Sequence, residues 1–369
     1  MRVFIFSAAA GGGHIRTAQA LEQYINHHVV DAKVKVVDAL KEVNYIYDKL
    51  ICKGYHFVAT KTPAIFGHMY HNTNDNSPLS KFVPKMNLSK RLLSLIHEFE
   101  PDIIVATHPF VAEMVSHLKG KGFIDAKLLV VMTDYAPHKT WIAEHVDGYI
   151  VANDDMVIPM VQDFGVEPEK IHPIGIPILE TFFHPQPKDS LRREMGLAPD
   201  KPTILLMAGS FGVKTIVQIY RDIIRVPMDF QMIVITGKNQ RLYQTLKTTV
   251  MLSPKKTKLI LFTQKVEQYM QASDLIITKP GGLTVTEALA SNLPLLVFDS
   301  IPGQEEDNAD FLELHGMARR LHKNESCTDA LKELLADKMQ LASMEQACKN
   351  FDQSDGCAKI VSLMKDMIK

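Results

Sequence analysis

The sequence lacks several features that would each point to a definite class of protein. Its 369 residues carry a formal net charge of only −1, so no overall positive field indicates a nucleic-acid partner. Its four cysteines include no Cys-x-x-Cys pair, and we expect reduced thiols rather than a disulfide framework or a zinc site. No apolar run reaches the roughly 18 residues of a membrane span. The short apolar N-terminus runs straight into three glycines, which favours a buried first strand over a signal peptide.

Two motifs that handle phosphate are also missing. No two aspartates are separated by a single residue, so the Asp-x-Asp metal clamp of one large class of sugar transferases is absent. No Gly-Lys-Ser/Thr turn occurs, which argues against a P-loop ATPase. Histidines and cysteines show no zinc spacing. We therefore expect neither a bound metal nor another cofactor.

Short apolar segments alternate with helical stretches, and ten of them are predicted strands, mostly continuous runs typical of parallel strands buried on both faces. We predict an α/β protein with two Rossmann-like, doubly wound parallel-sheet domains and a cleft between them. The N-terminal domain spans 1–175, a Pro-rich linker 176–200 and the C-terminal domain 201–350. A final helix at 351–369 can pack back on the N-terminal domain. The predicted strands are Val3–Ser7, Val34–Val37, Ile103–Thr107, Leu128–Thr133, Gly148–Val151, Ile204–Ala208, Gln231–Thr236, Lys258–Phe262, Leu275–Thr278 and Leu295–Phe298.

The segment Lys279–Ala288 carries the most informative motif. It follows the predicted strand Leu275–Thr278 and opens a helix over 284–290, so bare backbone N–H groups at a helix N-terminus can attract phosphate. Glu287, one turn inside, is placed to accept two hydroxyls of a ribose. The stretch 301–308 then offers acceptors and amides that suit a sugar. Together these segments predict a nucleotide-sugar pocket.

Two more loops follow predicted strands of the C-terminal domain. Met207–Gly212 repeats the strand–glycine–helix design, which would bring backbone donors and Ser210 to a diphosphate. This signal is weak alone and gains value beside Lys279–Glu287. Phe262–Val266 either presents backbone groups to the edge of a nucleobase or is a simple connecting loop.

The first predicted strand runs into Gly11-Gly12-Gly13-His14. Glycines let a backbone approach a ligand closely, and His14 either faces that ligand or caps the following helix. The dinucleotide pattern Gly-x-Gly-x-x-Gly is incomplete, because Arg16 stands where it needs glycine. Asp38, at the end of the second strand, suits a ribose-binding acid and leaves a dehydrogenase as an alternative.

His108 and Asp134 both lie just past predicted strand ends, where α/β enzymes keep their reactive groups. An imidazole or carboxylate there can take the proton from an attacking hydroxyl. A satisfied loop histidine and a plain helix cap are the structural alternatives. Because His14, His108 and Asp134 follow three strands of one domain, we predict that they act together.

Residues 41–91 hold eight Lys/Arg against three acids, a local charge of +5. Cations interleaved with aromatic rings suit an anionic lipid surface. Two ordinary amphipathic helices packed on the sheet are the alternative, and composition does not separate the two. The aromatic residues are Tyr45, Tyr47, Tyr55, Phe57, Phe66, Tyr70 and Phe82.

These motifs are similar to those of the monogalactosyldiacylglycerol synthase and processive diacylglycerol glucosyltransferase family, and more closely to its bacterial glucosyltransferases. The resemblance covers roughly residues 10–310, and its most specific part is Pro302–Asn308. One departure is Ala8-Ala9-Ala10, where a more polar lead is expected. The matching segments are Gly11–His14, Thr107–Pro109, Thr133-Asp134 with His138-Lys139-x-Trp141, Ile174–Pro177, Lys279–Glu287 and Pro302–Asn308.

The resemblance implies a GT-B arrangement that acts without a bound metal, with the lipid acceptor on the N-terminal domain and the UDP-sugar on the C-terminal one. It implies Glu287 for the ribose, the Pro280–Gly282 turn for the diphosphate, and Gln304–Glu306 for sugar or ribose hydroxyls. The predicted donor site is Gly209, Ser210, Phe262, Val266, Lys279, Pro280, Gly281, Gly282, Thr284, Glu287, Gln304, Glu305, Glu306 and Asn308; the acceptor site is Gly12, Gly13, His14 and Trp141.

We therefore expect an inverting, metal-independent transfer of a hexose, glucose by preference, from UDP-sugar to the 3-hydroxyl of 1,2-diacylglycerol, with His14 or Asp134 as base. The expected partners are UDP-hexose, diacylglycerol and, through residues 41–91, an anionic membrane surface; the expected place is the cytoplasm at the membrane periphery. The alternatives are a polyprenyl-linked peptidoglycan precursor as acceptor, a UDP-sugar 2-epimerase, and a non-catalytic UDP-sugar sensor. The sequence leaves the number of sugars added and the oligomeric state open.

Overall fold

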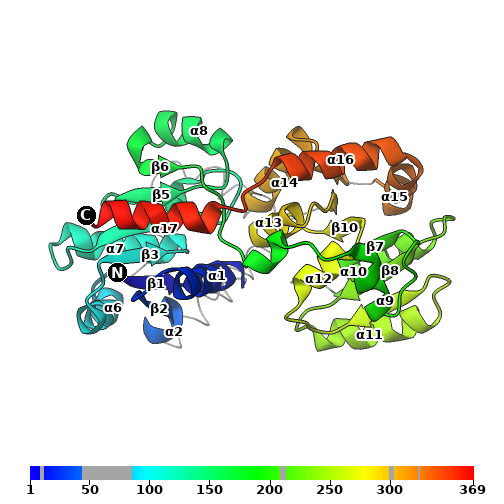
Figure 1. Ribbon diagram of the computed structural model, residues 1–369, viewed down its shortest axis with the longest axis horizontal. Coiled ribbons are helices and arrows are strands. Elements are labelled where there is room, and N and C mark those ends of the chain that lie inside the picture. Colours follow the sequence, from blue (N-terminus) through cyan, green and yellow to red (C-terminus); the bar gives the residue numbers. More distant parts are fainter. Residues whose placement is uncertain (9–11, 44–84, 208–212, 299–302, 323–324) are drawn as a thin grey trace. The chain divides into compact units, whose positions relative to one another are not determined.

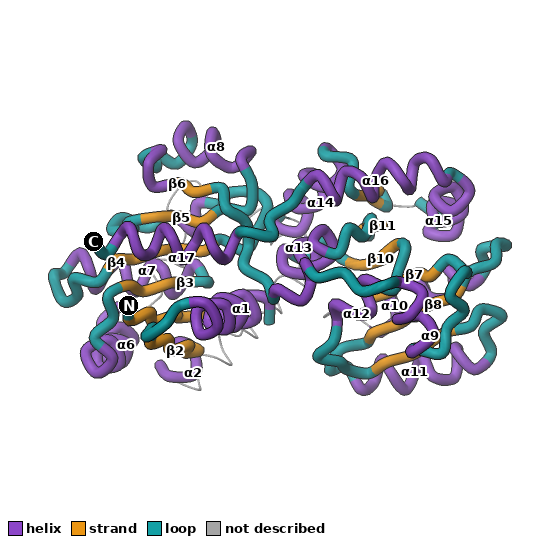
Figure 2. The backbone as a smooth tube through the Cα atoms, in the orientation of Figure 1, coloured by secondary structure: helices purple, strands orange, loops and turns teal. Residues whose placement is uncertain are grey.

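The computed structural model describes residues 1–8, 12–43, 85–207, 213–298, 303–322 and 325–369 (Figure 1). The chain divides into two compact units, and strand and helix alternate along each of them (Figure 2). Unit 1 comprises Met1–Glu180, Ile301–Asp307 and Gln353–Lys369; unit 2 comprises Thr181–Ser300 and Asn308–Asp352. Each unit contains one parallel six-stranded sheet among its described residues. This confirms the predicted fold class.

The sheet of unit 1 has the strand order β2-β1-β3-β4-β5-β6. Ile5 of β1 pairs in register with Val36 of β2 on one side and Val105 of β3 on the other. The strand order therefore reverses between β1 and β3, and open α/β sheets bind ligands beyond the carboxyl ends of the strands at such a point. The strands are β1 Arg2–Ser7, β2 Lys33–Asp38, β3 Ile103–Ala106, β4 Lys127–Val131, β5 Gly148–Ile150 and β6 Ile171–His172.

Helices cover both faces of this sheet. On one face, Leu21 of α1 and Ile360 of α17 share a buried core with Ile5, so the last helix of the chain packs beside the first (Figure 1). On the other face, Phe99 of α6 packs against Phe4 with ring centroids 4.9 Å apart and the ring planes tilted by 49°. The helices of unit 1 are α1 Gly13–His28, α2 Ala39–Val43, α6 Lys85–Phe99, α7 Pro109–Gly120, α8 Val157–Gln162 and α17 Gly356–Met367, with short 3₁₀ turns η1 Lys139–Trp141, η2 Asp154–Met156 and η3 Pro168–Lys170.

The sheet of unit 2 has the order β12-β11-β10-β7-β8-β9, so its strand order reverses between β7 and β10. The loop after β7, residues 208–212, lies outside the described residues, and the loop after β10 is Lys279–Gly281. The Lys279–Ala288 motif therefore stands at the second switch point. The strands are β7 Thr203–Met207, β8 Gln231–Ile235, β9 Thr257–Ile260, β10 Leu275–Thr278, β11 Leu295–Val297 and β12 Ala318–Arg320.

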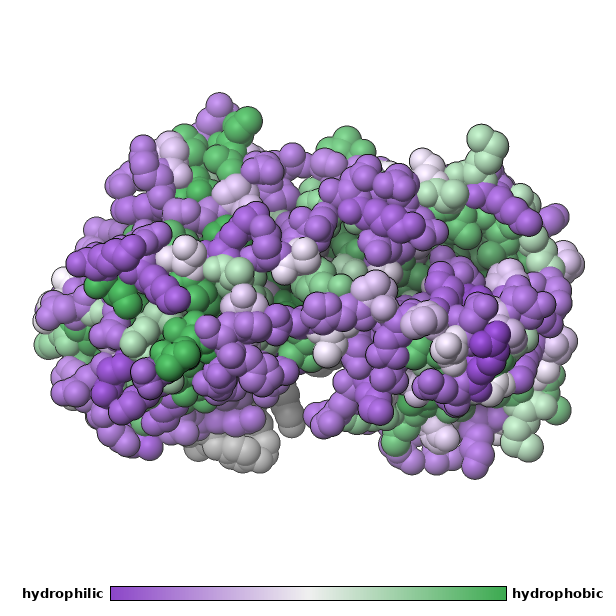
Figure 3. All heavy atoms as spheres, viewed as in Figure 1, coloured by the Kyte–Doolittle hydropathy of each residue, from purple (hydrophilic) through white to green (hydrophobic). Residues whose placement is uncertain are grey.

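The core of unit 2 joins its strands to α10, α11, α15 and α16. Tyr220 of α10, Leu246 of α11 and Met344 of α16 are buried against it. The outer surface of α16 is largely hydrophilic (Figure 3), because only its inner residues face this core. The helices are α9 Lys188–Glu194, α10 Val213–Ile224, α11 Gln240–Met251, α12 Val266–Gln271, α13 Gly282–Ala290, α14 Gln304–Leu314, α15 Cys327–Ala336 and α16 Lys338–Asn350.

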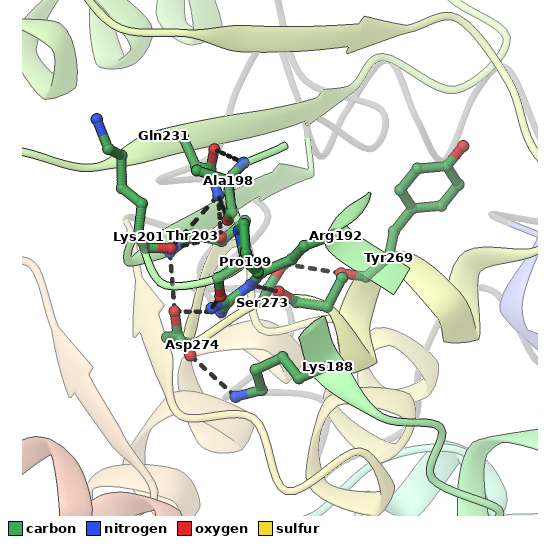
Figure 4. A network of polar contacts seen from close by, with 11 residues as sticks. Lys188, Arg192, Ala198, Pro199, Lys201, Thr203, Gln231, Tyr269, Ser273 and Asp274 are labelled. Carbon is green, nitrogen blue, oxygen red and sulfur yellow. Dashed lines mark hydrogen bonds and ion pairs between the residues drawn. The ribbon is translucent and has the colours of Figure 1, made fainter. Parts of the chain in front are cut away.

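Residues 176–200, the predicted linker, contain regular secondary structure. They include the 3₁₀ turn η4 Glu180–Phe183 and helix α9, whose Arg192 is only 5% exposed. Arg192 donates to Asp274 Oδ2 at 2.5 Å and to the Pro199 carbonyl at 2.9 Å (Figure 4). Asp274 also accepts from the backbone N–H of Thr203 and from Lys188 Nζ. This network fixes α9 to the amino ends of β7 and β10.

Candidate active site

The polar residues predicted at the strand ends of unit 1 lie together. The rings of His14 and His108 meet edge to face with their centroids 4.7 Å apart, and the Trp141 ring lies 6.0 Å from that of His14. Trp141 Nε1 donates a hydrogen bond of 3.3 Å to Asp134 Oδ2. The structure thus brings His14, His108, Asp134 and Trp141 into one cluster at the carboxyl ends of β1, β3 and β4.

Backbone geometry and two threonines hold His14 in this cluster. Gly12, the N-cap of α1, has φ +82°, a left-handed conformation that glycine adopts without strain. His14 sits two residues inside the helix and makes no cap, so the helix-cap alternative is wrong. Its Nδ1 lies 2.9 Å from Thr133 Oγ1, and its carbonyl accepts from Thr107 Oγ1 at 3.1 Å. Sequence reasoning missed both threonine roles, although each threonine directly precedes a predicted site residue.

Both imidazoles are held neutral. Burial lowers the pKa of His14 to about 4, and a hydrogen bond with Thr107 partly opposes this. Burial, followed by the proximity of His14, lowers the pKa of His108 well below its usual value. A neutral imidazole can accept a proton, as a general base must. Nδ1 of His14 faces Thr133 Oγ1, and the backbone of Thr107 is a second hydrogen-bond partner of the imidazole.

His108 also has the contact of a structural histidine. It is the N-cap of α7, and its Nδ1 accepts from the backbone N–H of Phe110 at 3.2 Å. Asp134, in contrast, is no helix cap, because the next helical turn, η1, is capped by His138. Asp134 is 5% exposed and lies directly before Tyr135, whose carbonyl accepts from Asn153 Nδ2. The Asp134 carboxylate is thus presented by a loop that is itself held in place.

The N-terminus of α13 in unit 2 has the geometry of an anion site. Its N-cap, Gly281, offers no side chain, so the N–H groups of the first turn are left for another partner. Asn308 Nδ2 donates to the Pro280 carbonyl at 2.9 Å and holds the loop that leads into the helix. A Cβ on Gly281 would meet only Lys279 Cε, at 3.8 Å. The fold therefore does not require glycine here, and the missing side chain leaves room for a phosphate.

The other predicted donor residues of unit 2 differ in their exposure. Glu287 is 2% exposed on the second turn of α13, while Lys279 and Thr284 are half-buried. Phe262 is 53% exposed, with Lys238 Nζ 5.7 Å from its ring centroid. Val266 is buried and opens α12, and Gly209 and Ser210 lie outside the described residues.

The first turn of α14, Gln304–Glu306, is part of unit 1, whereas Asn308 of the same helix is part of unit 2. Glu305 is buried, and Glu306 Oε2 accepts from the backbone N–H of Gly303 at 3.0 Å. Such a bond from a carboxylate back to the start of its own helix stabilises the first turn. Of this run, Asn308 makes the contact with the loop before α13.

The predicted lipid-binding segment is described only at its ends. Residues 44–84 lie outside the described residues, and Arg91 of α6 pairs with Glu42 of α2 at 3.3 Å. None of the described helices combines the length and the apolar character needed to cross a bilayer. Contact with a membrane surface stays a prediction.

The described residues contain no group of three or more His, Cys, Asp or Glu side chains placed to hold a metal ion. The cysteines among them, Cys327, Cys348 and Cys357, are free and buried, as expected for reduced thiols. Burial raises the pKa of each thiol to about 12, so all three are protonated and unreactive near neutral pH.

Each of the two units matches a known protein family. Residues 14–178 match the family model of monogalactosyldiacylglycerol (MGDG) synthase, and residues 203–360 match that of the glycosyltransferase family 28 C-terminal domain. A processive diacylglycerol beta-glucosyltransferase of Bacillus licheniformis is 30% identical over 361 residues, which are 98% of this chain and 93% of the relative.

Two solved structures show the fold. MurG of Acinetobacter baumannii matches with a TM-score of 0.67 at 15% identity over 99% of both chains. HepE of Anabaena, in complex with UDP-glucose, matches with a TM-score of 0.59 at 15% identity over 99% of this chain and 100% of its own. At such identity the likeness extends to the fold alone, which is the GT-B fold of two Rossmann-like domains.

Proposed function

This chain belongs to the family of diacylglycerol glycosyltransferases that includes MGDG synthase and the processive diacylglycerol beta-glucosyltransferases, and on this premise we propose its reaction. It transfers a hexose from a UDP-sugar to the 3-hydroxyl of 1,2-diacylglycerol and so makes a membrane glycolipid. Glucose is the proposed sugar, because a relative that matches nearly the whole chain is named a glucosyltransferase.

The observation that carries the proposal is the fixed, neutral imidazole of His14. If Nδ1–H donates to Thr133 Oγ1, the lone pair of Nε2 is left to take the proton of the acceptor hydroxyl. The hydroxyl oxygen then bonds to C1 of the sugar as the bond from C1 to UDP breaks, and UDP leaves with the electron pair. Attack on the side opposite UDP inverts the configuration at C1. Asp134, beside Trp141, is the alternative base.

We propose that the departing diphosphate lies at the N-terminus of α13. Backbone N–H groups and the positive end of the helix dipole would stabilise its negative charge, as a metal ion does in Asp-x-Asp transferases. The same proposal assigns Glu287 to the ribose, and Phe262 and Val266 to the nucleobase uracil. It assigns Gly209 and Ser210 to the diphosphate, and Gln304–Glu306 to hydroxyls of the hexose.

Membership of the family favours diacylglycerol over the other acceptors. The GT-B fold alone does not identify the acceptor or the reaction, since MurG and a UDP-GlcNAc 2-epimerase are also among the structural neighbours of this chain. We further propose that residues 41–91 hold the enzyme at the cytoplasmic surface of the membrane, where diacylglycerol lies. A silent sensor would bind UDP-sugar without turnover, and product analysis distinguishes it from a transferase.

The test incubates the purified protein with UDP-glucose or UDP-galactose and vesicles that contain dioleoylglycerol, then identifies the lipid product and its anomeric configuration. His14→Ala should abolish transfer and leave UDP binding intact. His27→Ala, on an exposed position of the same helix, is the matched control and should be fully active. Full activity of His14→Ala, combined with an inactive Asp134→Asn, would assign the base to Asp134 instead. A product that retains the donor's configuration would refute single inversion.

A further inference from the structure

Asn153 is a buried polar residue that takes no direct part in the proposed reaction. It follows β5 and is the N-cap of η2, and only 6% of its surface is exposed. A capping asparagine normally accepts a hydrogen bond from the first turn through its side-chain oxygen, as Asn239 does from the N–H of Leu242 in α11. The side chain of Asn153 makes no such bond. Local capping therefore does not account for this asparagine.

The side-chain amide of Asn153 is directed at the loop after β4 instead. Its Nδ2 donates to the Tyr135 carbonyl at 3.1 Å. Its Oδ1 is buried and accepts no hydrogen bond from the part of the chain that the structure describes. The reverse orientation of the amide would set Oδ1 against the carbonyl oxygen, and two acceptors repel each other. Since an unpaired buried acceptor destabilises the folded state, folding alone does not explain why an asparagine stands here.

Tyr135 is the last of three consecutive residues on which both candidate bases depend. Thr133 Oγ1 lies 2.9 Å from His14 Nδ1, and Asp134 Oδ2 accepts from Trp141 Nε1 at 3.3 Å. Each residue of this segment is thus held by a different part of unit 1: the first by α1, the second by η1 and the third by the loop after β5. A shift at the third contact would displace the other two.

The backbone that carries Asn153 is itself anchored. The carbonyl of Ile150, at the end of β5, accepts from the N–H of Met132 at 2.9 Å, which joins the two loops where they leave the sheet. Gln353, in the segment before α17, donates from Nε2 to the Ala152 carbonyl. The amide of Asn153 therefore extends from a fixed point and determines the place of the carbonyl that it binds.

We propose that Asn153 is a positioning residue, which holds the segment Thr133–Tyr135 in the place that catalysis needs. It acts through Thr133 if His14 is the base, and through the backbone of Asp134 if that residue is the base. This inference rests on the proposed function and adds to it a residue outside the cluster of candidate bases. Misplacing a catalytic group by about 1 Å lowers a rate roughly a hundredfold, so one contact of this segment can determine kcat.

The test uses Asn153→Leu, which has nearly the shape of asparagine but neither its donor nor its unpaired acceptor. With UDP-glucose and dioleoylglycerol vesicles, kcat should fall roughly ten- to a hundredfold, and the KM for UDP-glucose should stay unchanged. The urea midpoint of unfolding should stay near that of the wild type, because loss of the hydrogen bond and removal of the unpaired acceptor have opposite effects. Asp154→Asn, at the exposed next position, is the matched control and should equal the wild type in both measurements.

A double-mutant cycle distinguishes positioning from a general loss of structure. Once Thr133→Val has removed the contact with His14, Asn153→Leu should lower kcat further by roughly twofold or less, because both changes act on the same contact. If Asp134 is the base, the same non-additivity should appear in the background of Trp141→Phe instead.

The other outcomes overturn the inference in separate ways. An unchanged kcat in Asn153→Leu, or a full additional loss of kcat in both backgrounds, would overturn it and leave the proposed function standing. If Asn153→Leu does not fold, Asn153→Ala is measured in its place, and failure of both variants to fold would mean that the amide is structural. A wild-type protein that binds UDP-glucose but glycosylates no dioleoylglycerol would overturn the proposed function, and this inference with it.

Discussion

Replacing Gly281 by alanine separates the stability of the fold from the binding of the donor. Gly281 has φ −74° and ψ +131°, a backbone conformation that alanine adopts without strain. The added methyl group would meet only Lys279 Cε, at an ordinary contact distance of 3.8 Å. Alanine restricts the unfolded chain but is a poorer N-cap than glycine, so Gly281→Ala should change the free energy of unfolding by less than about 1 kcal/mol.

The same methyl group should weaken donor binding. It would stand at the N-cap of α13, where the diphosphate must approach the backbone N–H groups of the first turn. A hydrogen bond to a charged group contributes about 1.5–3 kcal/mol, so losing one of them should raise the Kd for UDP roughly ten- to a hundredfold. The affinity for UDP should therefore fall while the stability of the fold stays nearly the same.

Two measurements on the same protein test this. Urea unfolding gives the free energy of unfolding, and calorimetric titration with UDP gives the Kd without any acceptor. Ser291→Ala is the matched control at the other end of α13, where Ser291 Oγ donates to the Glu287 carbonyl at 2.9 Å. Its Kd for UDP should equal that of the wild type. A folded Gly281→Ala protein with unchanged affinity for UDP would refute the proposed diphosphate site.

The remaining predictions concern His14, Thr133 and Arg192. With a pKa of about 4, His14 stays neutral above that pH and is protonated below it, so kcat/KM should fall only as the pH drops through about 4; a fall centred near pH 6.5 would contradict this. Thr133→Val removes the hydroxyl beside Nδ1 and should lower kcat roughly tenfold or more in steady-state assays, with the donor KM unchanged. Arg192→Met breaks the buried pair with Asp274 and should lower the free energy of unfolding in urea by about 3–5 kcal/mol.

The sequence predicted strands correctly where burial on both faces requires a continuous run of apolar residues. All ten predicted strands are present, with ends within two residues of those expected, because a parallel strand covered on both faces needs apolar residues throughout. β6 and β12 were not predictable in this way. Ile171–His172 is too short to show a pattern, and Ala318–Arg320 carries two arginines that pair with acidic side chains. Pairing with β5 and β11 defines these two strands.

The candidate site was predictable in outline, because parallel strands bring their carboxyl ends to one edge of a sheet. That rule alone groups His14, His108 and Asp134. It does not reveal the hydrogen bonds of Thr133 and Trp141, since these depend on the strand order and on the path of the loop after β4. Likewise Asn308, predicted to meet the donor, donates to the Pro280 carbonyl because α14 passes that loop.

Release of UDP is the direct measure of transfer to diacylglycerol. UDP-glucose is incubated with the wild-type protein and anionic vesicles, with and without dioleoylglycerol, and free UDP is measured. Release of UDP should depend on dioleoylglycerol and should be lost in His14→Ala. Release at the same rate without dioleoylglycerol, or binding of UDP-glucose without any release, would contradict it.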